Sequence, residues 1–209
     1  MDPVDQTRET YDSIAPEYCK RTRQDKYLDW EDSYIKKMLS FMASSEPSIL
    51  DVGCGDGRHC KLFHENGART FGIDLSDAML AESKKYFPAG EFRKMDMRNL
   101  DFSDNHFDGI WSSGSIYHVP KSEISQVIRE FARVLKSRGI AAVNFKLGDE
   151  EGLMENPSSF GGAPRYFAFY SMEEMEDLFR NAGFEMLKCC NYPEEVFGDD
   201  LVQMWFRKI

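Results

Sequence analysis

Cysteine is scarce in this sequence, and its number and spacing indicate neither a disulfide framework nor a zinc site. The 209 residues hold five cysteines, an odd number, and none of them form the C-x-x-C pair of a zinc ribbon or redox motif. The adjacent Cys189 and Cys190 would point to opposite faces of a strand. His59 and His64 lie five apart and would not share a helix face as a metal pair does. We therefore expect reduced thiols and no metal site.

Positive charge is also in deficit. Lys and Arg number 26 against 36 Asp and Glu, which gives a formal net charge of −10 at pH 7. The densest basic run is confined to residues 20–23. Because non-specific nucleic-acid binding depends on clustered cations that release phosphate counterions, no nucleic-acid partner is expected.

Long apolar runs are absent as well. No segment approaches the roughly 18 consecutive apolar residues of a membrane-spanning helix, and residues 1–6 are polar where a secretory signal has an apolar core. We expect a cytoplasmic protein without a membrane partner. The apolar share of 42% is enough to bury a core, and the length suits one domain.

From residue 48 onward, short apolar strands alternate with amphipathic helices. This alternation predicts βαβ units and a mostly parallel sheet, that is, an α/β fold. Ser76 is the expected N-cap of one helix, and Ser171 with Glu174 forms a capping box for another, which Gly183 ends. The predicted strands are 48–52, 69–73, 92–95, 107–112, 140–147, 184–191 and 201–208, and the predicted helices are 58–65, 77–86, 122–136 and 171–182.

The residues before the first strand have a helical pattern. Trp30, Tyr34 and Met38 recur at spacings of three and four, and Pro16 is expected to separate an earlier segment from this helix. The prediction is an N-terminal helical cap over residues 1–45, followed by a single compact unit over residues 46–209.

One connection is much longer than the others. The 18 residues from Gly148 to Arg165 include four Gly and two Pro, a length that favours a cover over a functional site. At its end, Arg165 and Tyr166 join a cation to an aromatic surface, which suits an acceptor molecule with an acidic or aromatic part. A surface carboxylate is an equally consistent partner for Arg165.

A glycine-rich turn follows the first strand. Gly53, Gly55 and Gly57 allow a ligand to approach the backbone, but Arg58 stands where the dinucleotide fingerprint G-x-G-x-x-G requires its third glycine. This disfavours a nicotinamide or flavin cofactor. Asp74 lies 21 residues after Gly53 at the tip of the adjacent strand, where a carboxylate accepts hydrogen bonds from both ribose hydroxyls. A helix-capping acid beside Ser76 is the alternative reading.

These residues resemble the class I S-adenosylmethionine-dependent methyltransferases over essentially the whole chain. The resemblance implies a doubly wound, seven-stranded, mostly parallel sheet with its last strand antiparallel. It also implies S-adenosyl-L-methionine as the cofactor, bound across the carboxyl ends of the first four strands. The segments that carry it are 49–57, Asp74, Asp96–Met97 and 107–112, with 10–18 similar to the cap of the small-molecule branch and 182–184 to its late helix–strand junction.

The resemblance further implies which residues contact the cofactor. Asp74 would hold the ribose, Leu75 would pack on the adenine, and Asp96 with the Met97 backbone would meet the adenine edge. The tyrosines of the cap are equally consistent with a core role, and Asp96 with a local turn. The other implied cofactor contacts are Tyr11, Tyr18, Asp51, Gly53, Gly55, Ser112 and Ser113.

The predicted reaction is methyl transfer to a nucleophilic atom of a small-molecule acceptor. An in-line displacement needs donor and acceptor to be aligned and water to be excluded. If the acceptor is a hydroxyl or an ammonium group, His118 or Tyr117 is the candidate base. If it is a thiolate or carboxylate, positioning suffices, and His118 then only bonds a backbone carbonyl.

Three other functions stay open. A methyltransferase acting on protein or RNA is one, although the acidic composition disfavours RNA. Residues 113–115 read Ser-Gly-Ser, where many amino-group methylases carry an Asn/Asp-Pro-Pro-Tyr type signature. The others are a cofactor-binding module without chemistry and a nucleotide-dependent oxidoreductase.

Overall fold

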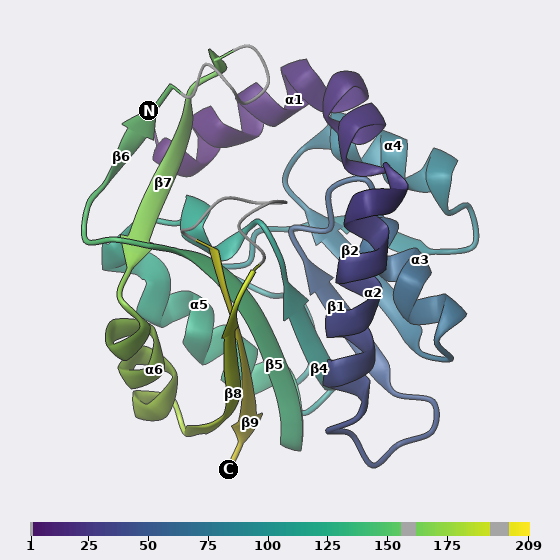
Figure 1. The fold of residues 1–209 in the computed structure, drawn as a ribbon, viewed down its shortest axis with the longest axis vertical. Coiled ribbons are helices and arrows are strands. Elements are labelled where there is room, and N and C mark those ends of the chain that lie inside the picture. The colour runs from purple at the N-terminus through teal and green to yellow at the C-terminus, as the bar shows by residue number, and fades with distance from the viewer. Residues whose placement is uncertain (1, 156–161, 193–200) are drawn as a thin grey trace.

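The structure is a computed structural model that describes residues 2–155, 162–192 and 201–209 (Figure 1). Its helices are α1 (Pro3–Thr22), α2 (Asp25–Leu39), α3 (Arg58–Glu65), α4 (Asp77–Tyr86), the 3-10 turn η1 (Ile116–His118), α5 (Lys121–Val134) and α6 (Met172–Asn181). Its strands are β1 (Ser48–Val52), β2 (Arg69–Asp74), β3 (Glu91–Lys94), β4 (Phe107–Ser112), β5 (Leu135–Leu147), β6 (Glu151–Met154), β7 (Arg165–Tyr170), β8 (Phe184–Asn191) and β9 (Leu201–Lys208). All seven predicted strands are present, with ends that differ by a few residues.

The strands form a doubly wound sheet, as predicted. Neighbours in the order β3-β2-β1-β4-β5 are parallel. Beyond them β9 runs antiparallel to β5, and β8 pairs with β9. Because the winding direction reverses between β1 and β4, their carboxyl ends flank a crevice of the kind where open α/β sheets bind ligands.

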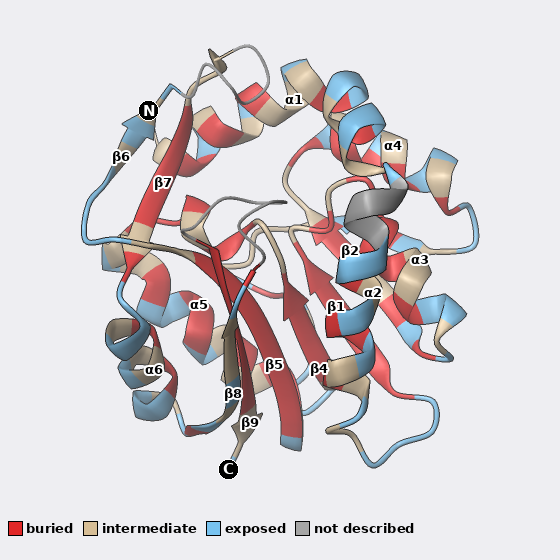
Figure 2. Cartoon of the chain, viewed as in Figure 1, coloured by how far each residue is buried: buried red, intermediate tan, exposed pale blue. Residues whose placement is uncertain are grey.

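Helices cover both faces of this sheet. Along β5, Ala141, Val143 and Phe145 pack into the core beneath α5 and α6. The alternate residues Ile140 and Ala142 pack on the opposite face, beneath α2 and α3. Strands buried on both faces are typical of a parallel sheet, and Figure 2 shows the central strands as the most buried part of the chain.

The long connection after β5 differs from its prediction. Instead of one open loop from Gly148 to Arg165, residues 151–154 form β6, which pairs antiparallel with β7, and β7 begins at Arg165. Residues 156–161 of the expected cover lie outside the described residues. Arg165–Tyr170 is rich in aromatic residues that favour strands, but its pairing with β6 and with the end of β5 is a long-range contact without a local sequence signal.

The expected break at Pro16 is also wrong. Pro16 lies inside α1, which continues to Thr22, and the chain turns at residues 23–24 before α2 begins. A proline removes one backbone hydrogen bond, and tertiary contacts hold this helix on both sides of it. After Pro16, the Thr22 hydroxyl donates to the Asp56 carboxylate at 3.4 Å. The Thr10 hydroxyl donates to the carbonyl of Pro164, and the Thr7 hydroxyl accepts from the Tyr166 amide. Figure 1 shows α1 lying across one end of the sheet, from β7 to α4.

The predicted helix ends are confirmed. The Ser76 hydroxyl accepts from the Met79 amide at 3.0 Å at the start of α4. The Ser171 hydroxyl accepts from the Glu174 amide at 3.0 Å at the start of α6. Gly183 follows that helix with a φ of 87°, the left-handed conformation that glycine adopts readily. The starts of α4 and α6 and the end of α6 are therefore determined by residues adjacent in the chain, as the sequence indicated.

Candidate active site

A cleft opens at the carboxyl ends of β1, β2 and β4 and is covered by α1. It holds about 830 Å³ of space when the open solvent at its mouth is included. The predicted site residues that line it are Tyr11, Tyr18, Gly53, Gly55, Asp74, Leu75, Asp96, Met97, Ser113 and His118. Residues remote in the sequence therefore meet in one place.

The other predicted residues lie behind the cleft wall. Asp51 and Ser112 are each 1% exposed beneath the floor. The ring of Tyr117 stacks on Phe167, with centroids 5.7 Å apart. Arg165 and Tyr166 belong to β7, and the Tyr166 hydroxyl turns away to bond Glu151. These residues contact the lining rather than form it.

Gly53 and Gly55 both line the cleft, but the structure favours glycine at the two positions for different reasons. Gly53 adopts a φ of 70°, and a Cβ built on it would stand 2.3 Å from the Cβ of Ser115. The Ser115 hydroxyl donates to the carbonyl of Val52 at 2.6 Å and so ties the loop after β4 to the turn. Gly55 has a φ of 52° and open space at its Cβ position. Gly53 is thus required by the protein's own packing, and Gly55 leaves room in the cleft.

Asp74 is a buried acid whose geometry is fixed by backbone donors. One carboxylate oxygen accepts from the Gly55 amide at 2.9 Å, and the other accepts from the Ser76 amide at 2.8 Å. Burial raises the pKa of Asp74 above its ordinary value, although these hydrogen bonds oppose the shift. A carboxylate offers about four acceptor positions, so the backbone donors do not use all of them and hydroxyl donors in the cleft can still be accepted.

Asp96 makes local contacts as well as lining the cleft. Its carboxylate forms an ion pair with Arg98 at 2.7 Å and accepts from the Arg98 amide at 2.8 Å. Arg98 in turn pairs with Asp2 of the N-cap of α1 and with Glu123 of α5, at 3.0 and 2.7 Å. The turn role left open by the sequence is therefore present in the structure, beside a position at the cleft edge.

His118 lies at the centre of a polar chain between η1, α1 and β7. Its Nδ1 stands 2.6 Å from the Tyr166 carbonyl oxygen, which only accepts, so Nδ1 carries the proton. Nε2 then accepts from the Tyr11 hydroxyl at 3.0 Å. Arg165 Nη1 donates to the same hydroxyl at 3.3 Å. Burial lowers the pKa of His118 to about 3, so the ring is neutral at working pH.

Asp12 is a structural contact to the site that sequence reasoning missed. One of its carboxylate oxygens accepts from the Ser76 hydroxyl at 2.6 Å and from the Ala78 amide at 3.1 Å. The acid of α1 thereby caps α4 directly beside Asp74. No local pattern signals this contact, because capping normally uses a residue adjacent in the chain, whereas Asp12 lies more than 60 residues before the helix it caps.

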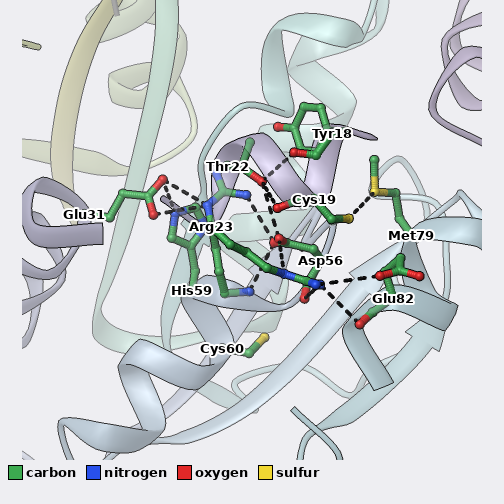
Figure 3. Close-up of polar contacts among 12 residues, drawn as sticks. Tyr18, Cys19, Thr22, Arg23, Glu31, Asp56, His59, Cys60, Met79 and Glu82 are labelled. Carbon is green, nitrogen blue, oxygen red and sulfur yellow. Dashed lines mark hydrogen bonds and ion pairs between the residues drawn. The ribbon is translucent and has the colours of Figure 1, made fainter. Parts of the chain in front are cut away.

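An ion cluster joins α1, α2 and α3 beneath the cleft wall (Figure 3). Arg58 donates to Glu31 at 3.0 Å and stands 3.3 Å from Asp56, which also receives Arg23 at 2.9 Å. Nε2 of His59 lies 3.1 Å from the Glu31 carboxylate. Burial alone would raise the pKa of Glu31, but Arg58 and His59 more than offset it and hold the pKa at about 2. Glu31 is therefore charged at neutral pH.

Asp51 has an incomplete set of partners. Its Oδ2 receives the Cys60 thiol at 3.4 Å, whereas its Oδ1 is buried without a hydrogen-bond partner in the described structure. Burial raises the pKa of Asp51 to about 6. This acid immediately precedes the glycine turn in the chain and does not line the cleft.

Other kinds of site were sought in the described residues. No group of three or more His, Cys, Asp or Glu there is placed to hold a metal ion. All five cysteines are free thiols. Among the described helices, none combines the length and the apolar character needed to cross a lipid bilayer.

Comparison with known proteins agrees with this geometry. The methyltransferase domain family matches residues 49–139. The ubiquinone/menaquinone biosynthesis C-methyltransferase UbiE of Campylobacter jejuni is 27% identical over a 222-residue alignment that covers 91% of this chain and 92% of the relative. The phosphoethanolamine N-methyltransferase of Plasmodium falciparum is 25% identical over 81% of this chain and 62% of the relative.

Among solved structures, the 1,6-didemethyltoxoflavin-N1-methyltransferase of Burkholderia thailandensis superposes with a TM-score of 0.77 at 19% identity. The superposition covers 98% of this chain and 88% of that one, which holds bound S-adenosylhomocysteine. The chain belongs to the class I S-adenosylmethionine-dependent methyltransferases. It is an enzyme of that class, with S-adenosylmethionine as its cofactor. This assignment replaces the nucleotide-dependent oxidoreductase that the sequence left open as an alternative.

Proposed function

We propose that this enzyme transfers the methyl group to a small-molecule acceptor that carries an anionic group. The observation that carries the proposal is the positive charge behind the cleft at His118. Arg165 is 6% exposed, bonds the Tyr11 hydroxyl, and with Lys146 lowers the pKa of His118 electrostatically. A buried cation beside a reacting cleft favours an anionic partner.

The covering helix supports a small acceptor. α1 is bonded to the β7 side through Thr10 and to α4 through Asp12, so it bridges the cleft. A polymer chain would need a continuous groove past this helix. The relatives named above act, by their names, on small molecules such as phosphoethanolamine and 1,6-didemethyltoxoflavin. We accordingly treat residues 1–45 as a cap on the unit formed by residues 46–209.

The residues that would hold the cofactor follow from the cleft lining. S-adenosylmethionine, when bound, supplies an electrophilic sulfonium methyl group. Asp74 has acceptor positions for the ribose hydroxyls, and Gly55 leaves the space that a ligand needs. Leu75 and Met97 would pack on the adenine and Asp96 would meet its edge. Asp51 and Ser112 would support this site from beneath the floor.

The acceptor side would be formed by Tyr11 and the groups that fix it. The hydroxyl of Tyr11 is held between His118 Nε2 and Arg165 Nη1. A histidine with a pKa of about 3 is a weak base at neutral pH. Burial also raises the pKa of Tyr117, which stays protonated. We propose that His118 acts by positioning Tyr11, and that the acceptor atom arrives already deprotonated.

The test is a search for the methylated product. Purified enzyme with methyl-labelled S-adenosylmethionine is incubated with metabolite extract separated into anionic, neutral and cationic fractions, and in parallel with total protein and total RNA. Label should enter the anionic small-molecule fraction, and Arg165→Met should reduce that incorporation at least tenfold while S-adenosylhomocysteine affinity stays within threefold. Label in RNA or protein alone would favour the runner-up functions.

A further inference from the structure

Arg58 has a donor, Nη2, that makes no hydrogen bond to another residue in the described part of the chain. It occupies the first position of α3, is 9% exposed, and lines the cleft together with Tyr18 and Gly53. Its Nε donates to both oxygens of Glu31, and its Nη1 donates to Asp56 at 3.3 Å. In the described part of the chain, Nη2 donates to no protein acceptor. One edge of a rigid, buried cation is thus left for a group in the cleft.

The acids around Arg58 fix its direction. Glu31 and Asp56 approach from different elements, α2 and the glycine turn, and Figure 3 shows both acids in one cluster with Arg23. Asp56 is fully buried and is shared between the two arginines. Such a cluster gives no clear gain in stability as a means of joining helices, because a protein with apolar residues in place of a buried ion pair is often equally stable. A cation held in a fixed orientation is, by contrast, suited to a directed, charge-assisted hydrogen bond from Nη2 to a carboxylate.

The cleft must accommodate one carboxylate in particular. The amino-acid part of S-adenosylmethionine carries an α-carboxylate, which needs a donor when it leaves water. Among the cations that line the cleft, Arg8 is engaged with Asp5, Glu9 and Asp12 on the outer side of α1, and its side chain is 25% exposed. Arg58 is the buried guanidinium in that lining.

We propose that Arg58 binds the α-carboxylate of the cofactor through Nη2, with Glu31 and Asp56 as its positioning residues. The turn at Gly53 and Gly55 brings the cleft floor alongside the start of α3, so that carboxylate and guanidinium meet at the same wall. The sequence by itself does not assign this role, because many members of the family that the chain resembles have another residue at the position of Arg58. The inference rests on the cofactor class and is independent of the acceptor.

The experiment compares two ligands that differ only by the carboxylate. S-adenosylhomocysteine and its decarboxylated analogue, which keeps the amine, are titrated by calorimetry into wild-type protein and Arg58→Met. Wild type should bind S-adenosylhomocysteine at least tenfold more tightly than the analogue, as one charged hydrogen bond predicts. In Arg58→Met this ratio should fall to within threefold of unity. The ratio is insensitive to a misfolded fraction, because inactive protein reduces both titrations equally.

Arg23→Met is the matched control, because Arg23 bonds the same Asp56 but does not line the cleft. Its ratio should equal that of wild type. A wild-type ratio near unity, an unchanged ratio in Arg58→Met, or an equal fall in Arg23→Met would each overturn the proposal. If Arg58→Met does not fold, a crystal structure of the wild-type complex with S-adenosylhomocysteine decides. A carboxylate oxygen within 3.2 Å of Arg58, roughly the hydrogen-bond limit, supports the proposal, and a carboxylate bound elsewhere refutes it.

Discussion

The imidazole Nδ1 of His118 lies 2.6 Å from the backbone carbonyl oxygen of Tyr166. This contact joins η1, which follows β4, to β7, and it sets the tautomer of the ring. Nε2 is left as the acceptor that holds the Tyr11 hydroxyl. A strand absent from the sequence-based prediction thus determines which nitrogen of the His118 ring carries the proton.

The first prediction concerns the pH dependence of stability. Because burial lowers the pKa of His118 to about 3 from the ordinary 6.5, the unfolded chain takes up a proton here before the folded one does. The stabilisation is present above pH 6.5 and is lost as the pH falls toward 3. Between pH 6 and pH 5 this group should reduce the free energy of unfolding by about 1 kcal/mol.

Urea unfolding of wild type and His118→Gln at pH 6 and pH 5 measures this contribution. The variant should show a pH-dependent loss smaller by about 1 kcal/mol. The other three histidines are common to both proteins and cancel in the difference. Equal losses in the two proteins would show that His118 titrates normally in the folded state.

The second prediction concerns Asp74 and the ribose. Asp74→Ala removes a charged acceptor for two hydroxyls, each worth about 1.5 kcal/mol or more, so S-adenosylhomocysteine should bind about 100-fold more weakly by calorimetry. Asp77→Ala is the control, because Asp77 starts the adjacent helix but is exposed and pairs with Lys94. An affinity change below threefold in Asp74→Ala would remove this acid from the cofactor site.

The third prediction separates the two glycines. Gly53→Ala places a Cβ 2.3 Å from that of Ser115 and should destabilise the fold by about 3 kcal/mol in urea unfolding. Gly55→Ala meets no protein atom within 4 Å, so it should cost only about 1 kcal/mol for its positive φ and instead weaken S-adenosylhomocysteine binding. Similar stability of the two variants would contradict the packing argument. Unchanged affinity in Gly55→Ala would show that no ligand approaches this turn.

The fourth prediction concerns the hydrogen bond between Tyr11 and His118. Tyr11→Phe and His118→Gln should each lower the single-turnover rate of methyl transfer, because each releases the hydroxyl from its fixed position. Residues in direct contact couple by about 0.5–3 kcal/mol, so the double variant should lose less than the product of the two single losses. A purely multiplicative loss would mean that the two residues act separately, and His118 would then contact the acceptor by itself.

The part of the cleft at the ends of β1 and β2 was predictable from the chain because its signals are local. Gly53, Gly55 and Asp74 stand at fixed positions relative to two consecutive strands, and parallel strands present their carboxyl ends at one edge. The arrangement around Tyr11 and His118 was harder to predict from the sequence. Arg165 and Tyr166 were noticed only as an isolated cation and ring, and their effect on Tyr11 and His118 passes through β7, whose pairing depends on β5 and β6.

The sequence by itself determined the order of the strands and helices other than β6 and β7, the caps of α4 and α6, the glycine turn and the acid of β2, because each depends on residues close to one another in the chain. Only the tertiary structure decided that α1 passes through Pro16, that Asp12 caps a helix more than 60 residues away, and that Arg58 lines the cleft. Such pairings are selected by the free energy of packing the whole chain. Many residues could serve as partners for a given acid, cation or hydroxyl, and the sequence pattern alone does not indicate which of them is the partner in the folded protein.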